Sequence, residues 1–528
     1  MIPRWAAAAL AAPPAVFLAV FFLWPLTAII ARGLSAGALA DALTDPGLRR
    51  VAWFTLWQAA LSTMLTVLVA LPGAYALSRF RFRGRAIVVA LVTVPFVLPT
   101  VVVGAAFLAL LPDRWHGTVT AILLAHVFFN YAVVVRTVGA MWAHLDPRLE
   151  EAARVLGASR WRAVREVTLP LLAPAVLAAA SIVFLFSFTS FGVVLLLGGP
   201  RHPTIEVEIY RLTAQALDLP GAAALALLQL VTMGLVLAWW GRGQARRAQA
   251  LRLQPAALAA QPPRTTGQRL FLGANLAFMA CFLGLPLLRL VERSLWTPSG
   301  YSLDSWRALG REGAGTSRVV PPVEAIMTSL QFSLAAVVIA VVLGGCAACA
   351  IAYAQRGGRL LDTGLMLPLG TSAVTIGFGL LITMNRPPVD LRASWWIVPI
   401  AHALVATPFV VRAALPVLRS IDPRLREAAA LLGAPPGRVW REVDLPLLGR
   451  ALLVGAGFAF AVSFGEFGAT AFLARAGTPT VPIAISQLLG RPGAVNVGQA
   501  YALSVILMVV TAAVMLAIEG FRSGRETF

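Results

Sequence analysis

Long apolar segments follow one another along the whole chain. About 20 apolar residues are enough for a helix to cross the hydrocarbon core of a bilayer. The pattern therefore predicts an all-α polytopic membrane protein with about twelve transmembrane helices in two series of six. The first series lies near 6–31, 51–78, 86–112, 117–142, 171–198 and 221–240, and the second near 270–292, 323–354, 360–383, 394–418, 447–473 and 499–519.

The two series are separated by a segment rich in Ala, Gln, Pro and Arg that shows no sustained apolar periodicity, which is typical of a flexible linker. We divide the chain into a first half, 1–240, a cytoplasmic linker, 241–269, and a second half, 270–528. The first apolar segment is longer than the ~7–15-residue core of a signal peptide. We expect it to be retained as a membrane span.

Arginine placement predicts the orientation, because positively charged residues in short loops stay on the cytoplasmic side. Arginines gather in 79–85, in the linker, in 356–359 and in 522–525, which all fall on one side of a twelve-span count. Both termini are therefore predicted to be cytoplasmic. The loops expected to face outward are 32–50, 199–220, 293–322 and 474–498.

Composition supports this interpretation: 59% of the residues are hydrophobic and 12% are charged. The formal net charge of +20 does not indicate nucleic acid, because the arginines lie in short segments between apolar stretches rather than on a polar face. The chain contains no lysine, which excludes a nucleotide-binding loop of the form G-x-x-x-x-G-K-[ST]. Any ATP has to be hydrolysed by a partner protein.

One segment occurs twice, at an offset of 276 residues (422 − 146). The same offset relates surrounding positions, including His126 to His402 and Ser187 to Ser463. The halves are therefore predicted to be parallel copies with the same orientation. The identical residues of the repeated segment are Asp146, Pro147, Arg148, Leu149, Glu151, Ala152, Ala153, Leu156, Gly157 and Ala158, matched by Asp422, Pro423, Arg424, Leu425, Glu427, Ala428, Ala429, Leu432, Gly433 and Ala434.

Each copy predicts a short amphipathic helix. Asp146 suits the N-cap, Pro147 suits the first helical position, and Gly157 supplies a stop. Leu149, Ala152, Ala153 and Leu156 follow the spacing i, i+3, i+4, i+7 and form a narrow apolar stripe. A helix of this kind suits insertion into a groove of a partner. The alternative, a helix lying on lipid headgroups, favours bulkier apolar residues than alanine.

Both copies resemble the EAA loop of ABC importer permeases, E-A-A-x3-G-x9-I-x-L-P, with Val167 and Val443 in place of the isoleucine. The resemblance implies the type I importer permease fold in the inner membrane of a bacterium, two separate ATPase subunits and a periplasmic or lipid-anchored solute-binding protein. It also implies that the loop couples to the ATPase through Glu151, Ala152, Ala153 and Gly157, and through Glu427, Ala428, Ala429 and Gly433. The chain resembles the fused permeases of thiamine and ferric iron. Thiamine is the favoured substrate, with ferric iron, sulfate, polyamine or phosphonate as alternatives.

The two copies also differ. Glu150 corresponds to Arg426, and Ser159-Arg160-Trp161 corresponds to Pro435-Pro436-Gly437. The loops are therefore predicted to contact their ATPase subunits differently, so that a mutation in one loop impairs transport more than the same mutation in the other.

Polar residues inside membrane spans are costly and are candidates for the substrate pathway. Glu466 is the most distinctive, because its counterpart in the first half is the neutral Ser190. It either attracts a cationic substrate or forms a hydrogen bond between helices. Asn130 and Ser190 are further candidates. His126 and His402 recur in both halves, which favours a structural role for them.

Two other classes of protein fit the pattern less well. An ion-coupled secondary transporter needs coupling carboxylates in mid-membrane, for which only Glu466 qualifies. A membrane-embedded enzyme needs a catalytic constellation, and we predict no catalytic residue, cofactor or metal. Cys346 and Cys349 form a C-x-x-C without a second cysteine pair or a nearby histidine, so we expect them to pack between helices.

Overall fold

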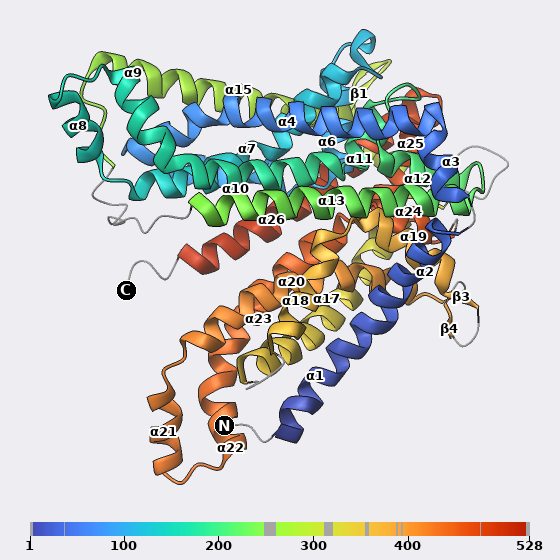
Figure 1. The fold of residues 1–528 in the computed structure, drawn as a ribbon. Helices are drawn as coiled ribbons and strands as arrows, with labels where there is room; N and C mark the ends of the chain where they lie inside the picture. Colours follow the sequence, from blue (N-terminus) through green and yellow to red (C-terminus); the bar gives the residue numbers. More distant parts are fainter. Residues whose placement is uncertain are drawn as a thin grey trace. The chain divides into compact units, whose positions relative to one another are not determined.

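The computed structural model describes residues 4–35, 37–247, 260–310, 320–353, 358–386, 389–391, 394–475 and 477–523, and the following concerns this part of the chain. Ten helices in it are long and apolar enough to cross a membrane (Figure 1). They are Ala8–Gly33, Pro46–Arg79, Val119–His144, Trp161–Phe188, Leu219–Ala238, Thr266–Leu295, Pro322–Tyr353, Ile397–Ser420, Gly437–Phe464 and Ala494–Ile518.

Two further pairs of helices are sharply bent. The helices α5 (Arg85–Val97) and α6 (Thr100–Leu110) meet at 100°, and α18 (Gly358–Gly370) and α19 (Ala373–Thr383) meet at 99°. Leu98 is extended at the first bend because the following proline disfavours helical geometry there. Counted as one span each, the bent pairs bring the total to the twelve predicted spans.

The remaining elements connect or extend these spans. Those of the first half are α1 (Arg4–Leu18), η1 (Ala19–Leu23), α2 (Trp24–Gly33), α3 (Ala38–Thr44), α4 (Pro46–Arg79), η2 (Asp113–Trp115), α7 (Val119–His144), α8 (Pro147–Val155), α9 (Arg160–Ala163), η3 (Val164–Thr168), α10 (Leu169–Phe188), α11 (Gly192–Leu197), α12 (Ile205–Ala214) and α13 (Leu219–Arg247).

The second half continues with α15 and ends with α26. Its elements are α15 (Thr266–Leu295), β1 (Trp296–Thr297), β2 (Gly300–Tyr301), α16 (Asp304–Arg307), η4 (Ala308–Gly310), α17 (Pro322–Tyr353), β3 (Asn385–Arg386), β4 (Val389–Asp390), α20 (Ile397–Ser420), α21 (Pro423–Leu431), α22 (Pro436–Val439), η5 (Trp440–Asp444), α23 (Leu445–Phe464), α24 (Thr470–Leu473), α25 (Val481–Leu489) and α26 (Ala494–Ser523). The two pairs of strands are short antiparallel hairpins.

The chain forms two compact units. The first unit consists of Ala40–Glu208 and Leu225–Arg293, and the second of Met1–Leu39, Ile209–Ala224 and Ser294–Phe528. In the first unit α4 packs against α7 and α10, and in the second unit α17 packs in the same way against α20 and α23. Each unit is thus built around an equivalent group of three helices, as the sequence repeat predicts.

The first apolar helix of each sequence half belongs to the other compact unit. α1 packs against α17, and α2 packs against α19. Conversely, α15 packs in the first unit, where Phe271 contacts Tyr75, and Phe278 contacts Tyr131. The compact units therefore do not coincide with the halves 1–240 and 270–528, which follow the order of the spans along the chain.

Two connecting segments contain helical residues that the sequence pattern does not predict. Residues 241–247 of the predicted linker continue α13, and 266–269 begin α15, while 248–259 lie outside the described residues. Within the predicted outward loop 199–220, residues 205–214 form α12, whose Glu206 is fully buried. Gln229 donates a hydrogen bond to Glu206, and the Ile205 N–H donates to Thr55 Oγ1 over 2.9 Å. Glu206 is therefore packed among helices and does not lie in an irregular loop.

The spans predicted at 171–198 and 447–473 are each interrupted. α10 ends at Phe188 and α11 begins at Gly192, while α23 ends at Phe464 and α24 begins at Thr470. Apolar periodicity alone does not reveal these breaks, because each contains few residues and apolar residues resume directly after it. The breaks place polar groups of the backbone inside each unit, beside the buried histidines described below.

Candidate functional site

The repeated segment forms two short helices, α8 and α21, each at one end of its own helix bundle (Figure 1). Asp146 Oδ1 accepts a hydrogen bond from the Arg148 N–H over 2.9 Å, and Asp422 Oδ1 accepts one from the Arg424 N–H over 3.0 Å. A proline occupies the first turn of each helix. The predicted N-caps are therefore confirmed.

Both helices end in a Schellman motif. Gly157 has φ 91° and Gly433 has φ 82°, a backbone conformation that glycine adopts without steric cost. The Ala158 N–H donates to Ala153 O over 3.0 Å, and the Ala434 N–H donates to Ala429 O over the same distance. The predicted stops are confirmed, and the two turns are equivalent in backbone structure.

Neither helix has a buried residue. Leu156 and Leu432 are 88% and 89% exposed, and Leu149 and Leu425 are about half exposed. Glu151 and Glu427 are exposed as well, while Ala153 and Ala429 are half-buried against the bundle. Exposed leucines gathered beside small residues are typical of a surface that binds a partner.

The surfaces of the two copies are alike at most positions and differ at a few. Arg162 pairs with Glu166 over 3.0 Å, and Arg438 pairs with Glu442 over 2.9 Å, at matching places. Trp161, which is 70% exposed, has Gly437 as its counterpart. The second copy thus lacks the largest exposed apolar side chain of the first.

The attachment of the two helices to their bundles also differs. The bundle helices α10 and α23 follow the two loops, and each is preceded by one π-helical turn, η3 before α10 and η5 before α23. The last residue of each turn is buried. In the first copy this residue is Thr168, which donates a hydrogen bond to Glu150 Oε2 over 3.3 Å. In the second it is Asp444, which forms an ion pair with Arg426 over 2.8 Å. The sequence shows the exchange of Glu150 for Arg426, but the partners became evident only from the structure.

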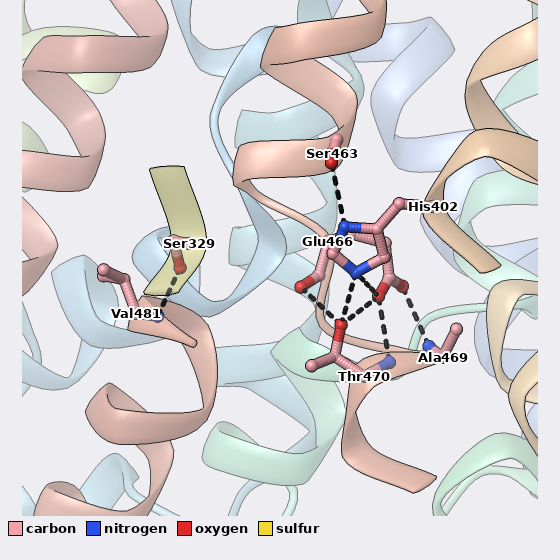
Figure 2. A network of polar contacts seen from close by, with 7 residues as sticks. All are labelled: Ser329, His402, Ser463, Glu466, Ala469, Thr470 and Val481. Atoms are coloured by element: carbon pink, nitrogen blue, oxygen red, sulfur yellow. Dashed lines mark hydrogen bonds and ion pairs between the residues drawn. The ribbon is translucent and has the colours of Figure 1, made fainter. Parts of the chain in front are cut away.

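Glu466 lies in a buried polar network within the second unit (Figure 2). Its carboxylate accepts hydrogen bonds from the N–H groups of Ala469 and Thr470, over 2.9 and 3.0 Å, and from Thr470 Oγ1 over 2.6 Å. His402 Nε2 is 3.4 Å from Glu466 Oε2, and His402 Nδ1 is 2.8 Å from Ser463 Oγ. The carboxylate thereby holds the beginning of α24.

The first unit has a related but uncharged network. His126 Nδ1 is 3.0 Å from Ser62 Oγ, and His126 Nε2 is 2.8 Å from Ser190 Oγ. Asn130 Nδ2 donates to His126 O over 3.0 Å. The structure thus brings Asn130 and Ser190 together around His126, as it brings Glu466 to His402. Each candidate for the substrate pathway makes hydrogen bonds inside its own unit, and its role in transport stays a prediction.

A cavity of about 970 Å³ lies in the second unit between α20, α23 and α26. Arg412 and Arg450 are the charged side chains among its described lining residues. Arg412 corresponds to Arg136 in the first half, whereas Arg450 corresponds to Pro174. The remaining lining residues are Phe409, Ala413, Val417, Leu447, Ala451, Leu453, Val454, Ala456, Gly457, Phe458, Val514, Ala517, Ile518 and Gly520.

Comparison with known proteins gives the same twofold organisation. Residues 62–249 and 336–523 each match the family described as "Binding-protein-dependent transport system inner membrane component". The two matches cover both repeated loops, the C-terminal parts of α4 and α17, and the other two helices of each three-helix group.

Relatives align with most of the chain. A "Thiamine transport system permease protein ThiP" of Brucella abortus (strain 2308) is 30% identical, over 97% of this chain and 96% of that protein. The protein of the same name from Escherichia coli (strain K12) is 28% identical over 84% of each. A "Sulfate transport system permease protein CysT" of Salmonella typhimurium is 32% identical over 40% of this chain and 82% of that protein. With two family matches and a relative aligned over nearly its whole length, the chain belongs to the inner membrane components of binding-protein-dependent transport systems.

Proposed function

We propose that this chain is a two-half permease of an ABC importer and that α8 and α21 are its coupling helices, each docked on one ATPase subunit. The observation that carries the proposal is the pair of equivalent exposed helices at the ends of their bundles, each with the sequence E-A-A and a glycine-stopped end. Two such helices suit two ATPase subunits that move together when they bind ATP.

The mechanism that we propose is alternating access. A solute-binding protein delivers substrate on the outer side, the ATPase subunits close on ATP, and the coupling helices transmit this motion to the helix bundles. The bundles then expose the solute to the cytoplasm. Both termini lie on the cytoplasmic side, together with α8 and α21. The permease itself makes and breaks no covalent bond.

Thiamine is the substrate that we favour. The support comes from relatives named as thiamine transport permeases, whose similarity extends over 84% and 97% of this chain. A likeness of this extent includes both bundles and both loops, rather than the loops alone.

An oxyanion such as sulfate is the second candidate. Among the described lining residues of the cavity, the charged side chains are those of Arg412 and Arg450, which favour an anion over a cation such as thiamine. The similarity to a sulfate permease also supports an anionic substrate, but it covers 40% of this chain. Glu466 does not supply a balancing negative charge to that cavity, because it is not among the lining residues.

Uptake by the reconstituted complex tests the function. We expect the ATPase subunits to copurify with the permease, and we expect ATP-dependent uptake of labelled thiamine. Reversing the charge with Glu151→Arg and Glu427→Arg together should lower uptake more than about tenfold, since a central interface residue often contributes ~2 kcal/mol or more.

Asp113→Arg is the matched control, because the Asp113 side chain is fully exposed and lies outside both loops. It should leave uptake unchanged. The proposal fails if no ATPase subunit associates, or if the double variant transports normally. Uptake of sulfate without uptake of thiamine would replace the first substrate with the second.

A further inference from the structure

The two coupling helices are attached to their bundles by different chemistry. Three positions make the attachment of α21: Arg426, Asp444 and Tyr353. At the same repeat positions the first half has Glu150, Thr168 and Leu77. All three positions therefore differ, although the helices that they join are equivalent.

We propose that Arg426 is a positioning residue for energy coupling, which ties α21 to the bases of α17 and α23, and that α8 lacks an equivalent tie and transmits less of the motion. The inference rests on the proposed function, in which both helices dock on ATPase subunits. It adds that the two helices are unequal, and it names the second as the stronger link.

The contacts of Arg426 form a closed network. Its Nε donates to Asp444 Oδ1 over 2.8 Å, and its Nη2 donates to the Tyr353 hydroxyl over 3.3 Å. The Tyr353 hydroxyl donates to Asp444 Oδ2 over 3.0 Å. The guanidinium carbon also lies 5.3 Å from the centre of the Tyr353 ring, within cation–π range. Both oxygens of Asp444 are thus satisfied.

The burial of this network makes it rigid. The side chains of Arg426 and Asp444 are 28% and 5% exposed, so the ion pair is shielded from water and salt. A buried charge is costly to leave without its partner, which opposes separation of the two groups. The single Thr168–Glu150 hydrogen bond of 3.3 Å in the first copy has no such opposition.

Asp444 and Tyr353, the partners of Arg426, connect the network to two membrane helices. Asp444 ends the π-helical turn from which α23 starts, and Tyr353 is the last residue of α17. α17 and α23 are two of the three central helices of the second unit. A displacement of α21 is therefore passed directly to two membrane helices through side-chain bonds.

In the first unit the acidic residue is on the coupling helix and the basic residue is on the bundle, which is the reverse of the second unit. The acid, Glu150, is on the coupling helix, and its electrostatic partner Arg79 is the last residue of α4. The Arg79 Nη1, however, donates to Leu145 O over 3.1 Å, in the turn that precedes α8. Arg79 therefore supports the connecting backbone, and no ion pair between it and Glu150 is formed among the described residues.

The experiment measures solute transported per ATP hydrolysed, in proteoliposomes that hold the complete complex. We expect Arg426→Gln to bind the ATPase subunits normally but to lower this ratio at least about fivefold, the lower end of typical coupling between sites. Glu150→Gln is the matched variant and should lower it less than about twofold, below that range. The inverted pair Arg426→Asp with Asp444→Arg should restore most of the ratio.

Two measurements distinguish a role of this network in energy coupling from a role in folding alone. Tyr353→Phe removes only the hydroxyl that joins α17 to Arg426 and Asp444, and it should lower the ratio while the elution profile and melting temperature stay unchanged. Rescue by the inverted pair would not occur if the guanidinium served only to fill space.

The inference is overturned if Arg426→Gln and Glu150→Gln lower the ratio equally, or if Tyr353→Phe and Arg426→Gln leave it unchanged in a complex whose unaltered form couples uptake to ATP. By contrast, failure of the unaltered chain to bind ATPase subunits would overturn the proposed function itself.

Discussion

Glu466 and Ser190 occupy the same repeat position, and the structure gives them comparable neighbours. Each is bonded to the buried histidine of its unit, His402 or His126. Glu466 also accepts two backbone N–H groups at the start of α24, which a serine is too short to do in the same way. A lone acid in an apolar span marks this position in the sequence, but its use as a cap is visible only once the break between α23 and α24 is known.

Glu466→Gln should destabilise the chain more than Ser190→Ala. The amide keeps one acceptor oxygen where the carboxylate has two, so at least one buried donor loses its partner, at a cost of about 1–3 kcal/mol in unfolding free energy. Ser190→Ala removes one hydrogen bond between helices, worth ~0.6 kcal/mol on average in a membrane protein. Thermal unfolding in detergent measures both.

Uptake kinetics of the same variants test the other interpretation of Glu466. If Glu466→Gln raises the KM for the solute and leaves the melting temperature unchanged, the residue contacts substrate and its role as a cap is minor.

The coupling helices show how far local rules reach at the scale of an element. Asp146 and Asp422 cap the helices, and Gly157 and Gly433 end them, as the sequence predicts. These features depend on residues within one or two turns, so propensity and capping rules are sufficient. What each helix is attached to depends on Asp444 and Tyr353, which are 18 and 73 residues away from Arg426.

Gly157→Ala and Gly433→Ala compare the two helices directly. Each substitution forces an alanine into the left-handed region and costs about 1 kcal/mol or more. No atom lies within 4 Å of the added methyl at either position, so the local cost is the same. We expect Gly433→Ala to reduce ATP-dependent uptake per folded complex more than Gly157→Ala does.

Asparagine, which tolerates the left-handed conformation, should preserve more activity than alanine at both sites. Equal losses in the two alanine variants would contradict the predicted inequality of the loops.

At the scale of the whole molecule, the bent pairs decide the topology. If α5 and α6 together cross the membrane once, Arg83 and Asp113 lie on opposite sides, with Arg83 on the same side as Ser159 of the first loop. If the pair turns back, Arg83 and Asp113 lie on one side. All three residues are exposed and therefore accessible to labelling.

Single cysteines at these positions test the crossing, after Cys281, Cys346 and Cys349 are replaced by alanine. We expect a membrane-impermeant thiol reagent to label Asp113→Cys in intact cells and to label Arg83→Cys and Ser159→Cys only in inverted vesicles. Labelling of Arg83→Cys and Asp113→Cys from the same side would exclude the twelve-span count.

The sequence by itself determined where the apolar segments lie, the duplication, the caps of α8 and α21, and the family. Each of these follows from residues that are near in sequence or from similarity along it. The tertiary structure decided that α1 and α2 pack in the second unit, that α15 packs in the first, that Glu206 is buried, and that Arg426 reaches Asp444 and Tyr353.

The physical reason is that helices in a membrane have no apolar face that must be hidden from lipid. Their partners are chosen by close packing and by side-chain hydrogen bonds, which join residues far apart in the chain. Periodicity therefore locates a helix such as α15 without revealing its neighbours. Only the packed structure shows which bundle each first helix completes, and which bonds tie each coupling helix to it.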